Sequence, residues 1–335
     1  MSAPIIIAGS GRSGTTWILD AIAKVNNLDT VFEPLHPIVV PKAKEFACKY
    51  VEKGDHEPEL FEFMSTVFNG QLRSLWATYR IRPDRLTLGS IRRNSNWQFR
   101  RFLSEYKRLA KNLKNYRRKK SNQVLFKFIR ANLMLGWLAE SFHAKIVFVL
   151  RHPAAVIASR IPLMEIGHGL SWGLDEDLYL YLNNEKLFDR YLQPYRDLLH
   201  DESLSLIASL SILWCIENIV PLIHAQSEGY CIVFYEDLIK DPDRHWERIT
   251  SALALDAVPG KALIEAPSQQ APDVMVKATY TEKQLSKWQH YFSNRQLEEI
   301  QNILNLFHVN IYTVQDPMPI DRIQDDRHYS CSTIS

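Results

Sequence analysis

A glycine-rich loop near the N-terminus carries the residues best suited to bind an anion. Gly9, Gly11 and Gly14 follow a short apolar segment and precede an amphipathic stretch. Their spacing fits the dinucleotide fingerprint, for which Asp29 or Glu33 would be an approximate ribose-binding acid. It also fits a phosphate loop in which the usual lysine has been replaced by threonine. Both templates place backbone N–H groups and a helix N-terminus around a phosphate-like group.

The residues within this loop favour the phosphate interpretation. Arg12 places a permanent cation beside the anion, whereas a dinucleotide-binding turn has small, neutral residues where the backbone approaches the phosphates. Thr15 and Thr16 add hydroxyl groups to the first helical turn. Without the lysine and without a convincing magnesium-binding aspartate, ordinary ATP or GTP hydrolysis is disfavoured. We therefore expect a loop that binds its phosphate group without a metal.

Two further short segments carry groups suited to proton transfer and charge stabilisation. Glu33 and His36 follow a second short apolar strand, and either side chain can act as a general base. Lys127 lies inside an otherwise apolar strand, where lysine is rare unless it is paired or functional. Arg130, three residues later, can contact an acceptor or serve the structure. The histidines show no metal-ligand spacing, so no metal is expected.

The elements that must position these groups alternate between apolar strands and helical patterns. We predict strands at Ile5–Ala8, Thr30–Phe32, Val124–Phe128, Lys145–Leu150 and Tyr230–Phe234. We predict helices at Thr15–Val25, Trp97–Arg118, Leu178–Leu199, Ser203–Ala225, Asp243–Ala254 and Glu282–Leu306. The alternation predicts an α/β fold with a parallel sheet flanked by crossover helices. We expect one domain over residues 1–315 and a polar tail over residues 316–335.

Two motifs together resemble a known family. Arg12-Ser-Gly-Thr-Thr-Trp17 resembles the 5′-phosphosulfate loop of sulfotransferases that use PAPS (3′-phosphoadenosine 5′-phosphosulfate), especially their carbohydrate and tyrosylprotein branch. Arg151, after an apolar strand, and Ser159 resemble the family's 3′-phosphate motif. Phe234-Tyr-Glu-Asp-Leu238 resembles a strand-end segment common in the family. The resemblance runs from about residue 4 to 306 and thins across residues 40–120 and 160–225.

The resemblance implies a P-loop-type fold, PAPS as donor with PAP (adenosine 3′,5′-bisphosphate) as product, and a hydroxyl acceptor. It makes Glu33 the catalytic base, with His36 as the alternative, and places Lys127 and Arg12 beside the leaving oxygen. Donor-binding residues would be Gly11, Arg12, Ser13, Gly14, Thr15, Thr16, Trp17, Arg151, Ser159 and Lys277. His152 would be structural. Helical insertions would form the acceptor site, and a carbohydrate or glycan is the expected acceptor.

Charge is distributed unevenly along the chain. The net charge is +2, yet residues 80–120 hold 15 Lys and Arg against two acids, a local balance of +13. This basic helical insertion can bind an anionic glycan or an acidic membrane surface, or it can be a solvated face. No recognition motif for nucleic acid accompanies it. Four scattered cysteines and a glycine-rich loop reached at once from the N-terminus predict a cytoplasmic protein.

Two other functions remain open at this point. A nicotinamide-dependent oxidoreductase would use the glycine spacing, although it has no reason to carry Arg12 together with Arg151 and Ser159. A non-catalytic polyanion-binding protein would tolerate replacement of Glu33 and Lys127.

Overall fold

The fold is built on one parallel β-sheet. The computed structural model describes residues 3–72, 123–165, 174–260 and 285–320. Its five strands are β1 (Ile5–Gly9), β2 (Asp29–Phe32), β3 (Val124–Phe128), β4 (Lys145–Leu150) and β5 (Cys231–Phe234). They pair in the order β2-β3-β1-β4-β5, every pair parallel. The predicted α/β class and all five predicted strands are confirmed, with ends shifted by one residue at most.

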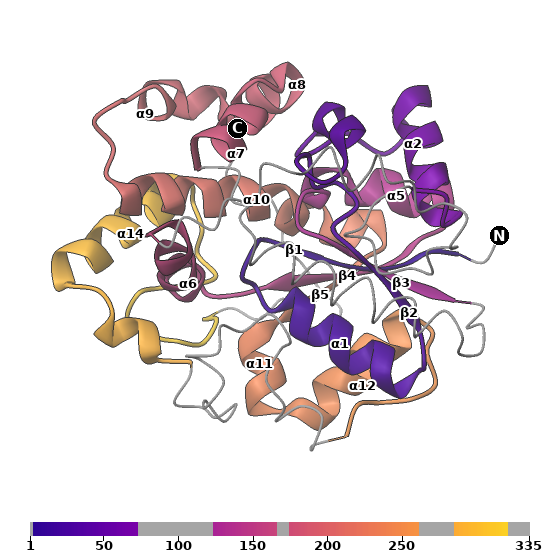
Figure 1. The fold of residues 1–335 in the computed structure, drawn as a ribbon. Coiled ribbons are helices and arrows are strands. Elements are labelled where there is room, and N and C mark those ends of the chain that lie inside the picture. The colour runs from indigo at the N-terminus through magenta and orange to yellow at the C-terminus, as the bar shows by residue number, and fades with distance from the viewer. Residues whose placement is uncertain (1–2, 73–122, 166–173, 261–284, 321–335) are drawn as a thin grey trace, which may run out of the picture.

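Alternating side chains bury both faces of the sheet. Ile5 and Ile7 point into a core with α1 (Thr15–Val25), α11 (Tyr235–Lys240) and α12 (Pro242–Ala252). Ile6 and Ala8 point into the larger core on the opposite face. Its helices include α2 (Pro58–Phe68), α5 (Leu135–Phe142), α6 (Pro153–Glu165), α10 (Leu206–Glu228) and α14 (Asn294–Leu306). Figure 1 shows the two layers, with α1, α11 and α12 below the sheet. Near-continuous apolar strands follow from this double coverage.

Helix α10 is the longest helix in the described part of the chain, at 23 residues. Its stretch Leu206–His224 is long and apolar enough to cross a membrane, but 72% of its most apolar window is buried inside the protein. Ser205 caps its start by accepting a hydrogen bond from the N–H of Ala208 at 3.1 Å. The helix is thus an all-round buried core element, packed against α6 and α14.

Two predicted helices are interrupted by capping residues. The predicted helix Leu178–Leu199 is wrong as one element: α7 (Leu174–Leu182) ends, and Asn184 caps α8 (Glu185–Leu187) through a bond from the N–H of Leu187. A π-helical turn Phe188–Leu192, a 3₁₀ turn Gln193–Tyr195 and α9 (Arg196–Leu199) follow. Likewise, Ser293 and Gln296 form a capping box at the start of α14, so this helix begins at Asn294, twelve residues after the predicted start at Glu282.

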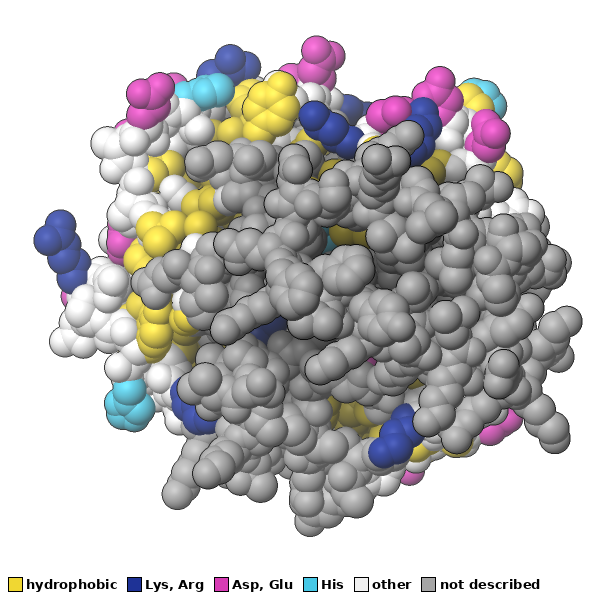
Figure 2. Space-filling model, viewed as in Figure 1, with side chains coloured by type: hydrophobic (Ala, Val, Ile, Leu, Met, Phe, Trp, Pro, Cys, Tyr) yellow, Lys and Arg dark blue, Asp and Glu magenta, His cyan; other side chains and the backbone are white. Residues whose placement is uncertain are grey.

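Other predicted segments lie outside the described residues. They include the basic insertion with its predicted helix Trp97–Arg118, and most of the polar tail. On the described part of the face in Figure 2, acidic and basic side chains alternate along the upper edge, where α2, α7 and α8 lie in Figure 1. Charges of both signs are therefore interspersed there, as on an ordinary solvated surface.

Candidate active site

The glycine-rich loop joins β1 to α1 at the carboxyl edge of the sheet. Gly14 has φ +98°, and a Cβ at this position would lie 2.5 Å from the ring of Tyr235, so only glycine fits without a shift. Gly14 is the N-cap of α1 and offers no side-chain cap, which leaves the first-turn N–H groups for an anion. Ser13 adds a buried hydroxyl without a hydrogen-bond partner among the described residues.

The two sequence motifs meet directly at this edge because β1 and β4 are neighbours in the sheet. Arg12 donates from Nε to Oγ of Ser159 at 2.9 Å. Arg151, at the end of β4, donates from Nη1 to the carbonyl oxygen of Arg12 at 3.0 Å. Arg12 has φ +75°, a conformation that is uncommon for a non-glycine residue. Two arginines and a serine hydroxyl therefore surround the loop.

The segment after β5 contacts Arg151 and the residue that follows it. The guanidinium of Arg151 lies over the ring of Tyr235, 4.3 Å from its centroid. Glu236 accepts the backbone N–H of His152 at 2.9 Å and the hydroxyl of Tyr312 at 2.8 Å. Tyr235 and Glu236 thus fix the phosphate loop and the residue after Arg151. Apart from the strand-end motif, no sequence pattern indicated these roles.

His152 is a structural residue in this geometry. Its Nδ1 accepts the N–H of Ala154 at 3.2 Å, so Nε2 carries the proton and donates to the carbonyl oxygen of Thr313 at 2.9 Å. The imidazole stacks on Trp288 with centroids 4.2 Å apart. Burial lowers the pKa of His152 to about 4. A fully buried, neutral imidazole here joins the C-terminal segment to the sheet.

Glu33 and Lys127 form a buried ion pair beside the loop. They lie at the carboxyl ends of the adjacent strands β2 and β3, and Nζ of Lys127 is 2.8 Å from Oε1 of Glu33. The other oxygen of Glu33 accepts the N–H of Ile129 at 3.2 Å. Burial lowers the pKa of Lys127, and the ion pair with Glu33 opposes part of that effect. Glu33 has φ +51°. The ends of β2 and β3 thereby hold a carboxylate and an ammonium group in direct contact.

His36 lies on the turn that follows Glu33. Its N–H donates to the carbonyl oxygen of Glu33 at 3.1 Å, and its side chain is buried. The structure therefore keeps both candidate bases in one turn. Asp29, by contrast, begins β2 and lies at the opposite edge of the sheet from the loop. It cannot bind a ribose whose phosphates occupy the loop.

Comparison with known proteins identifies the family. The model of the sulfotransferase family matches residues 4–259, more than half of the chain. The chain belongs to the sulfotransferase family. The family predicted from the two motifs is confirmed, and the nicotinamide alternative is set aside. This sulfotransferase has no match among curated protein sequences.

Several solved structures resemble this sulfotransferase at low identity. One is the sulfotransferase domain of the Synechococcus PCC 7002 olefin synthase, with 16% identity, TM-score 0.44 and coverage of 92% of this chain and 95% of that chain. Another is the sulfotransferase domain from the curacin biosynthetic pathway, with 15% identity, TM-score 0.43 and coverage of 92% and 98%. A third is mouse sulfotransferase SULT7A1 complexed with PAP, with 11% identity, TM-score 0.42 and coverage of 92% and 86%.

Some predicted donor-binding residues of this sulfotransferase have other neighbours. Trp17 is buried between Tyr235 and Trp246, with centroids 5.7 and 5.3 Å away, so its backbone alone is available to a phosphate. Thr15 is buried in the first turn of α1 and Thr16 is half-buried. Lys277 lies outside the described residues. In the part of the chain that the structure describes, no three His, Cys, Asp or Glu side chains gather as metal ligands would.

A cavity of about 170 Å³ adjoins the phosphate loop. One part of its wall is formed by Gly11, Arg12, Cys48, Ile129 and Arg130, and helices α6, α7 and α10 contribute the rest. Arg160 of α6 donates to the carbonyl oxygen of Gly11 at 3.3 Å from Nε and 3.2 Å from Nη2, and binds Glu217 of α10 at 2.6 Å. Sequence reasoning missed both residues, since Arg160 follows Ser159 without a motif of its own and Glu217 lies in an apolar helix.

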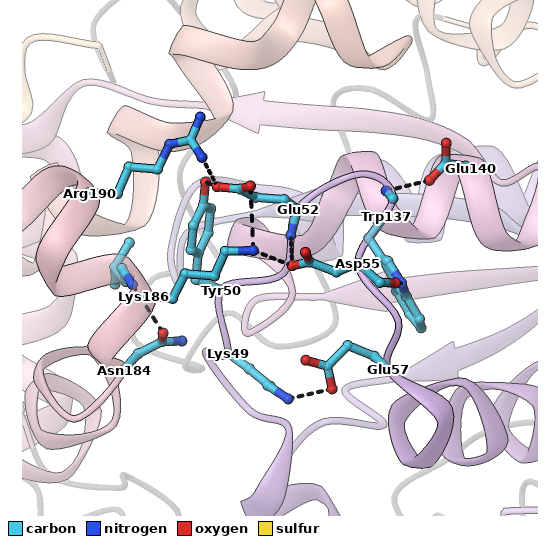
Figure 3. A network of polar contacts seen from close by, with 12 residues as sticks. Lys49, Tyr50, Glu52, Asp55, Glu57, Trp137, Glu140, Asn184, Lys186 and Arg190 are labelled. Carbon is cyan, nitrogen blue, oxygen red and sulfur yellow. Dashed lines mark hydrogen bonds and ion pairs between the residues drawn. The ribbon is translucent and has the colours of Figure 1, made fainter.

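A polar network ties the loop after β2 to the segment around α8 (Figure 3). Lys186 binds Asp55 at 2.5 Å and Glu52 at 3.4 Å, and Arg190 also pairs with Glu52. Tyr50 donates to Glu52 at 2.6 Å. Two parts of the cavity wall lie close to this network in sequence, because Cys48 precedes Tyr50 and helix α7 ends shortly before Lys186. The network of this sulfotransferase therefore joins two chain segments that adjoin the cavity.

Proposed function

We propose that this protein transfers a sulfuryl group from PAPS to a hydroxyl acceptor, with a carbohydrate as the first acceptor class to test. The observation that carries the proposal is the convergence of Arg12, Arg151 and Ser159 at one edge of the sheet. Arg12 is far in sequence from Arg151 and Ser159, yet the three residues form one cationic, hydroxyl-bearing site around a helix N-terminus. Such a site suits a nucleotide with two separate phosphate groups.

The residues present fit the donor substrate. The loop from Gly11 to Thr16 would hold the 5′-phosphosulfate through backbone N–H groups and Arg12. Arg151 and Ser159 would hold the 3′-phosphate, and Nε of Arg151 is a buried donor without a hydrogen-bond partner among the described residues. An anionic phosphate oxygen would accept a hydrogen bond from this buried N–H group and so satisfy it.

The pair of Glu33 and Lys127 supplies the two functions that sulfuryl transfer needs. The acceptor hydroxyl oxygen forms a bond to sulfur as the bond from sulfur to the bridging phosphate oxygen breaks. Glu33 would accept the hydroxyl proton as general base. Lys127 and Arg12 would stabilise the negative charge that develops on the departing oxygen. The 2.8 Å ion pair supports this assignment because both groups lie at one point of the site.

Transfer of radiolabelled sulfate from PAPS tests the proposal directly. The acceptor panel should contain glycans, lipids, phenols and peptides, so that the acceptor class is found in the same experiment. Calorimetry with PAP tests the donor site without any acceptor. Absence of PAP binding by the wild-type protein would overturn the proposal. A different result would favour a non-catalytic binding protein: the wild-type protein binds PAP but transfers sulfate to no acceptor. In that case, variants of Glu33 and Lys127 should bind polyanions as well as the wild type does.

A further inference from the structure

The cavity beside the phosphate loop contains a buried cation with unused donors. Arg130 is 6% exposed, and its Nε and Nη1 have no hydrogen-bond partner in the described ranges. Its Nη2 lies 3.5 Å from Oδ1 of Asp177, at the limit of a hydrogen bond. A buried guanidinium is unfavourable unless hydrogen bonds complete it. The unused donors of Arg130 therefore call for acceptor atoms from a ligand in the cavity.

The acidic residues of the cavity wall do not offer an equivalent site for a cation. Glu217 is engaged by Arg160 at 2.6 Å, and Asp177 lies against Arg130. The wall contains three arginines and two acids, so positive charge is in excess. Burial also raises the pKa of Glu217 to about 7, which reduces its negative charge near neutral pH. The electrostatics of the cavity therefore favour an anion.

The size and remaining wall of the cavity limit what can enter. A volume of about 170 Å³ is close to that of an engineered cavity of about 150 Å³ that holds one benzene ring. Apolar side chains complete the wall and would cover the carbon skeleton of a ligand: Ile129, Met164, Leu174, Leu210 and Leu213. A compact molecule with one ring and one charged end matches this combination of surfaces.

The cavity also adjoins the loop that is predicted to bind the donor. Gly11, Arg12 and Ile129 belong to its wall, and the N–H of Ile129 holds Glu33 at 3.2 Å. A molecule in the cavity therefore has one part beside the glycine-rich loop and beside Ile129, the residue whose N–H holds the candidate base. Arg130, the residue after Ile129, is close enough to hold a second group of the same small molecule.

We propose that the acceptor is a compact hydroxylated molecule, or a terminal unit of a larger one, that carries an anionic group bound by Arg130 inside this cavity. The inference rests on the proposed sulfuryl transfer and narrows its acceptor class from hydroxyl compounds in general to acidic ones of about one ring. Carboxylate and phosphate groups share the required chemistry, since both accept hydrogen bonds from a guanidinium.

Matched acceptors that differ only in the anionic group test the inference. One series is glucose, glucuronate and glucose 6-phosphate, and a second is phenol and 4-hydroxybenzoate. Calorimetry measures their binding to the protein–PAP complex, and sulfate transfer from PAPS is measured in parallel. We expect an acidic member to bind at least about tenfold more tightly than its neutral partner. The glucuronate and phosphate arms distinguish the two kinds of anion.

Variants assign the effect to the cavity. Arg130→Gln should remove the preference for the acidic member, Arg130→Lys should keep part of it, and the exposed Arg295→Gln should leave it unchanged. Leu174→Phe should fill the cavity and weaken both members of a pair while sparing PAP. The Leu174→Phe result decides the matter if Arg130→Gln does not fold.

Three results would overturn the inference while PAP still binds. They are equal or tighter binding of every neutral member, an acidic preference that survives in Arg130→Gln, and unchanged acceptor binding in Leu174→Phe. Failure of the wild-type protein to bind PAP would instead overturn the proposed function itself, so the two failures are distinguishable.

Discussion

Arg12 and Ser159 are 147 positions apart in the sequence, yet Nε of Arg12 donates to Oγ of Ser159 at 2.9 Å. The contact joins the loop after β1 to helix α6 after β4. The family resemblance gives these two residues to different phosphates of the donor. Because they touch here, donor binding must either exchange this bond for bonds to phosphate oxygens or keep it between the two phosphate sites. In both cases the two halves of the site are coupled.

The first prediction concerns the 3′-phosphate. Arg151→Ala should weaken PAP binding by about tenfold or more, because a charge-assisted hydrogen bond contributes roughly 1.5–3 kcal/mol. Its binding of AMP, which lacks the 3′-phosphate, should change much less. Calorimetry with both nucleotides measures the difference. Equal affinities of the wild-type protein for PAP and AMP would contradict the assignment of Arg151 and Ser159.

The second prediction concerns the base. Glu33→Gln should lower turnover by roughly two to four orders of magnitude while PAP affinity stays nearly unchanged. The variant should also be less stable by about 3 kcal/mol, because Lys127 is then buried without its charge partner. Combining Glu33→Gln with Lys127→Met should restore part of that stability. If turnover survives in Glu33→Gln and is lost in His36→Ala, His36 is the base.

The third prediction uses two glycines that share a backbone conformation but not an environment. Gly14 and Gly54 have φ +98° and +85°, and a Cβ would meet the Tyr235 ring at Gly14 but nothing within 4 Å at Gly54. Gly54→Ala should lower stability by about 1–3 kcal/mol through backbone strain and leave PAP affinity unchanged. Gly14→Ala should weaken PAP binding as well, since the loop or the ring must move. Equal PAP affinities for the two variants would contradict a role for the close approach.

The fourth prediction is a pH dependence of stability. Burial raises the pKa of Glu236 from 4.5 to about 7. The folded state therefore binds more protons than the unfolded state between these values, so this group's contribution to stability falls as pH rises from about 4.5 to 7. Glu236→Gln cannot ionise and should gain stability relative to the wild type across that window, by up to about 3 kcal/mol.

Denaturant unfolding at a series of pH values measures this difference. His152, whose lowered pKa makes an opposite contribution between about pH 4 and 6.5, is present in both proteins, so that contribution largely cancels in the comparison. A stability difference that stays constant from pH 4.5 to 8 would show that Glu236 titrates normally.

The fifth prediction concerns residues 80–120, which lie outside the described residues. Reversing the charges of Arg117, Arg118, Lys119 and Lys120 together should raise the Michaelis constant of an anionic acceptor and spare PAP. The wild-type constant should also rise steeply with salt, because exposed charges are screened over about 8 Å at physiological ionic strength. An unchanged acceptor constant and salt response in the variant would make the segment a solvated face. The membrane contact, like the cytoplasmic location, stays a prediction.

Local patterns were sufficient to predict the five strands and the first helix. The five strands are short apolar runs bounded by polar residues, and such runs report burial on both faces of a parallel sheet. The glycine spacing and Arg12 predicted a loop with an open helix N-terminus, and the structure has one, because the backbone conformation there depends on residues close in sequence. The long predicted helices were broken where Asn184 and Ser293 cap new starts, since side-chain capping competes with a continuous helical pattern.

The tertiary structure alone decided which distant residues act together. Strand order places β3 between β2 and β1, and this brings Lys127 to Glu33 at 2.8 Å. The same packing places Arg130, Arg160 and Glu217 around one cavity beside the loop. The sequence determined the family and the position of the glycine-rich loop between β1 and α1, because both depend on contiguous residues. The cavity and its unused arginine donors depend on contacts between strand ends and helices far apart in the chain, which only the packed sheet brings together.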